Sequence, residues 1–547
     1  MKFPIRHLFI SLVGTCVFLL AISLRAQQSP ASTTHSKACS IDNSPPSEAD
    51  RALFLDDFKK TEVLSRAALK KDSADRLAHL SLVRALIGTD KVDEAQKEVD
   101  AWTSSAAQEP YAIVAAGELR HAEGYWLESY ALMLKALKLD PCLPTAYAGL
   151  AAYESASGYR LTARKHLTLA HQLDPANREY ELDWIFTLPL SEQILNLQSF
   201  LDRQNDLTDK QSRALHLKLG SLKAESGHAC ELAASDGPAH IPMVPMYAPY
   251  RVGVAAYGIE IAFNGKKRVL QIDTGASGFV LTRTGATALG LSPIEKSLVD
   301  GFGSGGGTNT LLQQANSVHI GGLEFKDCVV QSLAVNGVLG GGNQIGERLD
   351  DTDGIVGSDI FSRYLVTLDY IRHEIRLDPL PQPFAAPSGP LDALGGSTDP
   401  DWMQIDRVVP PSMDSWTKVY RNGHELIMPA RLSRAGEGGS QQLFIIDTGA
   451  ESNLIDTAVA KQITHANESD NGLMGLGGGI VRLSETGKFV LDFAGLRLPV
   501  SSMDAINLPP HGGISGFLGY PTLSQLVMQI DYRDDLVHLT DPNGQHK

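Results

Sequence analysis

The chain has 547 residues, too many for a single hydrophobic core, so two or more domains are expected. Hydrophobic residues make up 43% of it and charged residues 20%, which is typical of a globular protein. Its 63 acidic and 48 basic residues give a net charge of −15, and no run of lysine and arginine follows the N-terminus. This balance argues against a nucleic-acid partner, because phosphate binding needs a basic surface.

Residues 1–26 are typical of a secretory signal peptide. Basic residues precede an apolar run over residues 8–24, and the chain turns polar around Ala26. This segment is therefore predicted to direct export from a bacterial cytoplasm, to the periplasm or the extracellular space. Because Leu24 is large for a cleavage site, an uncleaved N-terminal membrane anchor stays open as an alternative.

Residues 50–223 are predicted to form an all-α domain of helical repeats. The region is rich in Ala, Leu, Lys and Glu, and its apolar residues recur at helical spacing. Two Asp-Pro pairs, at 140–141 and 174–175, are separated by the tetratricopeptide period, and about three units of this period are expected over residues 76–177. The region thus resembles tetratricopeptide repeats, which implies a docking surface for a protein or peptide. A helical array that only spaces or supports the rest of the chain is the alternative.

The remainder of the chain is expected to divide into two β-rich halves. Residues 224–246 lose the helical spacing and gain Gly, His and Pro, so they are predicted to be a linker. Residues 247–377 form the first half, and a Pro- and Gly-rich linker at 378–399 separates it from the second half at 400–547. Each half opens with alternating or apolar strand residues and an Asn-Gly turn.

Both halves contain the same short motif. The sequence Ile-Asp-Thr-Gly-Ala ends an apolar run at Ala276, and the same sequence ends another at Ala450. Further along, an apolar-apolar-Gly segment and then an apolar strand ending in Asp-Tyr recur in both halves at a constant offset. The equivalent pairs are Gly357 with Gly519 and Asp369 with Asp531. An internal repeat of this length predicts two similar lobes.

At these motifs the chain resembles the aspartic proteases, with features of the retropepsin-like and pepsin-like types. The resemblance covers roughly residues 247–539 and implies an all-β bilobal fold with a cleft between the lobes. In that family each lobe supplies one catalytic Asp, braced by the later apolar-apolar-Gly strand. The predicted fold is therefore multidomain: an all-α tetratricopeptide solenoid followed by an all-β bilobal aspartic protease fold.

Asp273 and Asp447 are the predicted catalytic residues. Two carboxyl groups held together cannot both ionise cheaply, so one keeps a proton, and the pair serves as general base and general acid. The resemblance implies that the following threonines hydrogen-bond across the lobe junction, and each glycine lets the backbone approach closely. Alanine replaces the hydroxyl residue that follows Asp-Thr-Gly in pepsin-like enzymes, so we expect a less acidic pH optimum. The supporting residues are Thr274, Gly275, Ala276, Thr448, Gly449 and Ala450.

A glycine-rich stretch follows the motif in each half. Mobile glycine turns suit a flap that closes over substrate, and two copies favour two flaps over the single flap of pepsin-like enzymes. Ordinary surface loops are the alternative. The candidate flap residues are Gly301, Phe302, Gly303, Gly475, Leu476 and Gly477.

No metal ion or organic cofactor is expected. The sequence contains no His-Glu-x-x-His, paired Cys-x-x-Cys or Gly-x-Ser-x-Gly motif, and water is the only co-substrate that the dyad needs. A Gly-x-Gly-x-x-Gly match begins at Gly301 but follows no strand-to-helix unit, so a dinucleotide site is not expected. Beyond Cys16, the four cysteines are scattered and suggest no disulfide framework, so we expect free thiols, with disulfide pairing in an exported protein as the alternative.

The leading hypothesis is an exported aspartic-type endopeptidase that hydrolyses peptide bonds in a peptide or protein substrate, with helical repeats for protein docking. One alternative is a catalytically silent peptide-binding scaffold. Another is that each lobe pairs with a second copy of the chain. If the repeats only recruit substrates, deletion of the chain before about residue 235 should spare the cleavage of a short peptide.

Overall fold

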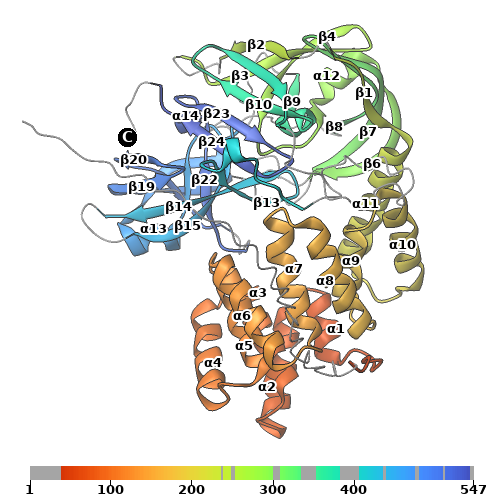
Figure 1. Ribbon diagram of the computed structural model, residues 1–547, viewed down its shortest axis with the longest axis vertical. Coiled ribbons are helices and arrows are strands. Elements are labelled where there is room, and N and C mark those ends of the chain that lie inside the picture. The colour runs from red at the N-terminus through yellow and green to blue at the C-terminus, as the bar shows by residue number, and fades with distance from the viewer. Residues whose placement is uncertain are drawn as a thin grey trace, which may run out of the picture. The chain divides into compact units, whose positions relative to one another are not determined.

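The computed structural model describes most of the chain beyond residue 38 (Figure 1). The predicted signal peptide lies outside the described residues, as does most of the predicted second linker. Among the residues described, no helix is both long and apolar enough to span a membrane. The described ranges are 39–235, 238–247, 253–299, 308–333, 353–381, 406–434, 439–474, 480–508 and 512–542.

The N-terminal part is all-helical and repeats with a constant period. From α3 to α8, the first helix of each pair starts at Arg76, Pro110 and Pro144, which are evenly spaced in the sequence. This spacing equals that of the two Asp-Pro pairs, so the predicted period of the helical repeats is confirmed. The helices are α1 (Glu48–Phe54), α2 (Phe58–Lys71), α3 (Arg76–Gly88), α4 (Val92–Ser105), α5 (Pro110–Ala122), α6 (Trp126–Leu139), α7 (Pro144–Ala156), α8 (Arg160–Leu173), α9 (Arg178–Phe186), α10 (Leu190–Arg203) and α11 (Asp209–Gly227).

Local chemistry explains where these helices begin. Asp75 accepts hydrogen bonds from two backbone N–H groups of the first turn of α3, and Asn177 does the same for α9. Proline occupies the first position of α5 and α7, where its missing N–H costs nothing. The helices pack through small residues. A side chain at Gly117 would meet Met133 of the next helix, which is why the pair crosses closely.

Within its described residues, the first lobe contains strands β1 to β11 and the α-helix α12. Its central strands run in the order β3, β4, β9, β5, β8, β7, β6, and β4 and β9 are parallel. The elements are β1 (Ala229–Ser235), β2 (Ala239–Met246), β3 (Ala256–Phe263), β4 (Lys266–Asp273), β5 (Phe279–Leu281), α12 (Arg283–Leu289), β6 (Ser292–Val299), β7 (Thr308–Ile320), β8 (Leu323–Leu333), β9 (Gly354–Gly357), β10 (Tyr364–Asp369) and β11 (Glu374–Pro379).

The second lobe repeats this order. Its parallel pair is β15 with β22, and β23 pairs with β10 of the first lobe, so one sheet runs through both lobes. The elements are β12 (Thr417–Lys418), β13 (Tyr420–Asn422), β14 (Glu425–Ser433), β15 (Ser440–Ile446), β16 (Leu454–Asp456), α13 (Thr457–Ile463), β17 (Ala466–Met474), β18 (Ile480–Thr486), β19 (Phe489–Phe493), β20 (Leu496–Val500), β21 (Asp504–Ile506), β22 (Ile514–Leu518), α14 (Tyr520–Leu523), β23 (Val527–Asp531) and β24 (Leu536–Thr540).

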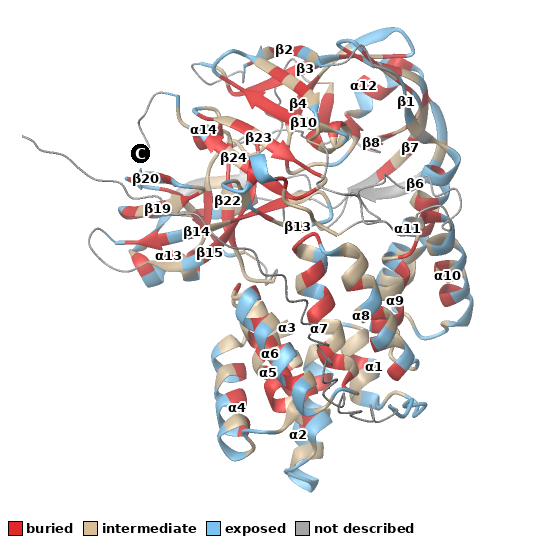
Figure 2. Ribbon diagram, viewed as in Figure 1, coloured by how far each residue is buried: buried red, intermediate tan, exposed pale blue. Residues whose placement is uncertain are grey.

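One core spans the two lobes. Buried apolar side chains from both, including Phe263, Phe444 and Tyr532, belong to a single cluster. In Figure 2 the buried residues (red) run along the strands of both lobes, whereas α10 shows buried and exposed residues on different faces. The prediction of an all-α repeat region followed by an all-β two-lobed part is confirmed.

Residues 224–246, predicted to be a linker, instead contain two strands of the first lobe. Strand β1 pairs with β8, and β2 pairs with β11 through residues 239–242 and with β3 through residues 243–246. Among the described strands, each half of β2 pairs along one edge alone, and an edge without a partner strand tolerates the prolines that suggested a linker.

The expectation of free thiols is also wrong. Cys230 of β1 forms a disulfide with Cys328 of β8, and Cys39 and Cys142 are disulfide-bonded as well. The Cys230–Cys328 bond closes a loop whose ends are 98 residues apart in sequence. Sequence spacing did not indicate this pairing, because the two cysteines become neighbours only when β1 joins β8.

Candidate active site

The two Asp-Thr-Gly motifs stand at the ends of matching strands. Asp273 is the last residue of β4, which lies parallel to β9, and the Cα of Asp273 is in register with Gly357. Asp447 directly follows β15, which lies parallel to β22. Each apolar-apolar-Gly segment therefore lies beside its own Asp strand.

Four hydrogen bonds between the threonines and the opposite strands join the lobes. The Thr274 N–H donates to the Thr448 hydroxyl, and the Thr448 N–H donates to the Thr274 hydroxyl, both at 3.0 Å. The Thr274 hydroxyl donates to the Ile446 carbonyl at 2.8 Å, and the Thr448 hydroxyl donates to the Ile272 carbonyl at 3.1 Å. Both threonines are buried, so this symmetric network fixes the two aspartate strands against each other.

Glycine is required after each threonine because the opposite carboxyl group lies there. A Cβ built on Gly275 would stand 2.9 Å from the carboxyl carbon of Asp447, and a Cβ built on Gly449 would collide with the carboxyl group of Asp273. The structure thus brings Asp273 and Asp447 together, with a hydrogen bond between their side chains.

Backbone N–H groups fix the orientation of each carboxylate. Asp273 accepts from the Gly275 N–H at 2.8 Å. Asp447 accepts from the N–H groups of Gly449 and Ala450, both at 2.9 Å, through the same oxygen. Within its own loop Asp447 therefore has an additional backbone donor, from Ala450, and this donor favours its charged form.

Burial raises the pKa of both aspartates. The pKa of Asp273 lies well above its ordinary value, because the negative charge of Asp447 adds to the effect of burial. Burial also raises the pKa of Asp447, but the hydrogen bond from Asp273 and the backbone N–H groups oppose that rise. These directions favour Asp273 as the protonated member of a pair that shares one proton and titrates as a unit.

Two polar side chains near the dyad were missed in the sequence. The His424 ring Nε2 lies 2.9 Å from the Gly275 carbonyl oxygen, and the Gln271 amide donates to the Gly449 carbonyl at 3.4 Å. Each side chain thus reaches the glycine of the opposite lobe. Gln271 could have been noticed as the one polar residue within the apolar run from Val269 to Ile272, and His424 as the residue that follows Asn-Gly.

The candidate flap residues lie outside the described residues in both lobes. The strands that flank them are described. Antiparallel β6 and β7 pair up to Val299 and Thr308, and antiparallel β17 and β18 pair up to Met474 and Ile480. In each lobe, the described strands before and after the glycine-rich stretch therefore pair with each other.

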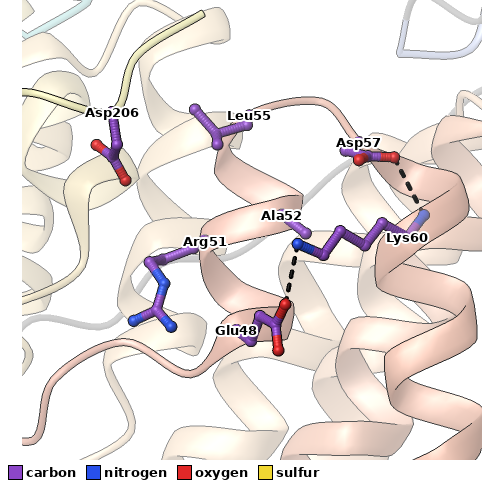
Figure 3. A pocket seen from close by; sticks show the side chains of 7 residues that line it. All are labelled: Glu48, Arg51, Ala52, Leu55, Asp57, Lys60 and Asp206. Atoms are coloured by element: carbon purple, nitrogen blue, oxygen red, sulfur yellow. Dashed lines mark hydrogen bonds and ion pairs between the residues drawn. The ribbon is translucent and has the colours of Figure 1, made fainter.

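A surface pocket lies in the helical part, away from the dyad (Figure 3). Its side chains come from α1, α2 and the segment around Asp206, and Lys60 forms an ion pair with Glu48 at 2.9 Å. Of the other charged groups, Arg51 donates to the Pro46 carbonyl and Asp206 pairs with Arg178, so these charges are already engaged. Among the described residues, no group of His, Cys, Asp and Glu is arranged to hold a metal ion.

Comparison with known proteins supports the assignment of the first lobe. Among curated proteins no sequence matches the chain. An aspartic proteinase from Irpex lacteus is 13% identical, with a TM-score of 0.35 over 56% of this chain and 98% of its own. A thermophilic TPR protein from Thermus thermophilus is 15% identical, with a TM-score of 0.26 over 32% of this chain and 95% of its own. Residues 259–360, which include Asp273 and its bracing strand β9, match the family model described as aspartyl protease.

Proposed function

We propose that the protein is an aspartic endopeptidase whose dyad is Asp273 and Asp447. The observation that carries the proposal is the meeting of two half-buried carboxyl groups, one from each lobe, that share a hydrogen bond. Such a pair holds one proton at a pH where an isolated carboxyl group is ionised. An acid and a base at one point are the groups that amide hydrolysis needs.

The proposed reaction follows from the protonation of the pair. The Asp447 carboxylate takes a proton from water as the water oxygen bonds to the substrate carbonyl carbon, and Asp273 gives its proton to the carbonyl oxygen. The resulting diol collapses when the carbon–nitrogen bond breaks. Asp447 then protonates the departing nitrogen, and one diol hydroxyl returns a proton to Asp273. Each carboxyl group thus ends in its starting state.

The test is hydrolysis of a mixed peptide library by the full chain across pH, beside Asp273→Asn and Asp447→Asn. Each variant keeps the shape of the side chain but removes its acid–base function. Cleavage by the parent that either change abolishes is the expected result. A parent that binds peptides but cleaves none at any pH, with both variants folded and binding equally, would favour the silent scaffold.

We also propose that the protein is exported, as its N-terminal sequence predicts. The Cys230–Cys328 disulfide supports this, because disulfides persist mainly in oxidising compartments. Fractionation of the producing cells, with mass measurement of the mature chain, distinguishes cleavage near Ala26 from retention as an anchor. Intact chain in the cytoplasmic fraction with reduced cysteines would contradict export.

A docking role for the repeats is the third part of the proposal, with folded protein substrates as the partner. Leu127 and Leu134 support it, because they lie two helical turns apart on one face of α6 and are 60% and 39% exposed. The Leu127→Lys/Leu134→Lys variant should raise KM for a folded protein and leave KM for a short peptide unchanged. Leu195→Lys is the matched control on α10, where the leucine is 70% exposed. Equal effects from both variants would contradict docking at α6.

A further inference from the structure

The helical repeats contact the second lobe through the same turn of two successive units. Trp126 and Arg160, the first residues of α6 and α8, occupy equivalent positions in these units. The Trp126 indole N–H donates to the Gly512 carbonyl at 2.7 Å. The Arg160 guanidinium donates to the Asp535 carboxylate at 2.7 Å, and Asp535 is fully buried. The repeat period therefore places two polar anchors on one lobe.

The turns that precede these helices touch the lobe with their backbones. Gly124 and Gly158, which are also equivalent in the two units, have φ values of +85° and +79°. A Cβ on Gly124 would stand 2.8 Å from the Gly513 carbonyl oxygen, and a Cβ on Gly158 would stand 2.6 Å from the Asp535 carboxylate. Both turns thus require glycine for two reasons, the left-handed backbone and the approach of the lobe.

Asp406 adds a third kind of contact at the same place. Its carboxylate accepts from the N–H groups of Leu161 and Thr162 at 2.9 and 3.2 Å, and from the Thr162 hydroxyl at 2.7 Å. A residue from outside the helical region thus caps the start of α8, which has no cap of its own. The repeats are therefore fixed to the second lobe by hydrogen bonds as well as by packing.

Aromatic side chains of the repeats support the strand that precedes Asp447. The Trp126 and Tyr153 rings lie 4.9 and 6.0 Å from the ring of Tyr420, and Trp126 belongs to one apolar cluster with Leu443 and Ile445. Alternate side chains of a strand share a face, so Leu443 and Ile445 lie on one face of β15. The helical residues therefore pack on one face of the strand that leads directly into Asp447.

The Tyr420 hairpin also reaches the other lobe. Strands β13 and β14 are paired from Tyr420 with Ile427 to Asn422 with Glu425, and His424 lies in the turn between them. The His424 ring bonds to the carbonyl of Gly275, next to Asp273. A displacement of Tyr420 would therefore move His424 and, through it, the loop that holds Asp273.

We propose that the helical repeats are a positioning element of the active site, in which Trp126 and Tyr153 hold the Tyr420–His424 hairpin against the dyad. The inference rests on the proposed proteolytic function and adds a role for residues outside the protease lobes. Trp126 and Tyr153 are positioning residues, because they act on the dyad through His424 and β15 and touch no reacting atom.

This arrangement reverses one expectation from the sequence. Deletion of the chain before about residue 235 would remove Arg160 from the buried Asp535, uncover the apolar cluster around Ile445, and remove Cys230 with most of β1. Short-peptide cleavage should therefore be lost with the repeats rather than spared. The cleaner test uses the full chain and single substitutions.

Trp126→Ala and Trp102→Ala form a matched pair in the full chain. Both tryptophans are nearly buried, at 5% and 6% exposure, and both stack on a histidine of the preceding helix. Trp102 packs in the core of the repeats, whereas Trp126 also contacts the second lobe. We expect Trp126→Ala to lower kcat on a short peptide about tenfold or more, and Trp102→Ala to lower the melting temperature with little change in kcat.

A double-mutant cycle tests the route through His424. If Trp126 acts by holding the hairpin, the Trp126→Ala/His424→Ala variant should lose little more kcat than His424→Ala alone. Tyr153→Phe and Trp126→Phe, which keep an aromatic ring, should retain more activity than the alanine variants. The inference would be overturned if the kcat losses of Trp126→Ala and His424→Ala multiplied in the double variant. Equal kcat losses from Trp126→Ala and Trp102→Ala would also overturn it.

The outcomes separate this inference from the proposed function. If the parent cleaves no peptide, the proposed function fails first. If the parent cleaves and Asp273→Asn does not, the proposed function holds, and unchanged kcat in folded Trp126→Ala then overturns the positioning role alone. Circular dichroism and melting temperature establish that each variant is folded.

Discussion

The two lobes agree where they meet each other and differ at the turn where the second lobe meets α8. His373 and Asp535 occupy equivalent turns of the two lobes, with φ values of +57° and +51°. In the first lobe His373 stacks on Tyr257. In the second lobe Asp535 is buried and forms ion pairs with arginines that include Arg160 of the repeats. The two lobes thus have the same backbone conformation at this turn, but only in the second lobe does the side chain of the turn residue, Asp535, form an ion pair with the repeats.

A second pair of equivalent residues has opposite electrostatics. Burial tends to raise the pKa of Asp369, but the hydrogen bonds and charge of Arg372 outweigh it and lower that pKa. Burial and the charge of Asp534 raise the pKa of Asp531 to about 6. In the second lobe, the negative charge of Asp534 lies near Asp531, so ionisation of Asp531 costs more free energy than ionisation of the equivalent Asp369.

The largest expected effect comes from Asp273 and Asp447, which occupy equivalent positions in the two lobes. Asp273→Asn and Asp447→Asn should each lower kcat/KM by about 10²- to 10⁴-fold, because each removes one half of the acid–base pair. Peptide hydrolysis under identical conditions measures both losses. A variant that keeps more than about a tenth of the activity would show that the two lobes do not contribute equally.

The next largest effect is a loss of stability that we expect to differ between the equivalent turn residues Asp535 and His373. Asp535→Asn should lower the free energy of unfolding by about 3–5 kcal/mol, because it leaves buried arginines without their carboxylate. His373→Asn should cost less than about 1 kcal/mol, since asparagine tolerates the left-handed turn. Denaturant unfolding of both variants measures the difference. Equal losses would mean that the turn, rather than its contact with the repeats, determines stability.

The threonine network should respond symmetrically. Thr274→Val and Thr448→Val should each cost about 1–3 kcal/mol, because each leaves a buried N–H and a buried carbonyl of the opposite lobe unpaired. Each should also lower kcat, because the network fixes the spacing of the dyad. Unfolding and peptide kinetics check both. A large loss from only one of the two variants would contradict the symmetry of the junction.

The smallest expected effect depends on pH. The raised pKa of Asp531 means that its stabilising contribution is present below about pH 4 and is lost as the pH rises to about 6. The lowered pKa of Asp369 has the opposite sign, and its contribution is present above about pH 4 and lost as the pH falls. At pH 7, Asp369→Asn should therefore destabilise the protein, whereas Asp531→Asn should be neutral or stabilising. Melting temperatures at pH 4 and pH 7 measure the sign, and the same sign for both variants at pH 7 would contradict the account.

The sequence predicts the parts of this structure that are repeated within it. The period of the helical repeats follows from spacing alone, because each unit needs the same residues to bury its face on the next. The meeting of Asp273 and Asp447 is implied by the resemblance of the duplicated motif to the aspartic proteases, in which each lobe supplies one catalytic Asp. These features are local or periodic, so they are visible in a single sequence.

The contacts between unlike parts could not be predicted. Nothing near Trp126 in the sequence indicates Gly512, 386 residues away, as the partner of its indole N–H. The pairing of β1 with β8 could not be predicted for the same reason, because the two strands are far apart in the sequence. The prolines of β2 suggested a linker because the sequence does not show which edge of a strand lacks a partner. His424 was missed because its role depends on a glycine of the other lobe.

The central claim is that both lobes of one chain form a single active site. Asp273→Asn, Asp447→Asn and an equimolar mixture of the two variants, refolded together, test it most directly in a peptide-cleavage assay. Each variant chain lacks one member of the pair, so we predict that the mixture is as inactive as either variant alone. Recovery of a substantial fraction of parental activity in the mixture would show that lobes of different chains pair, and would contradict the single-chain site.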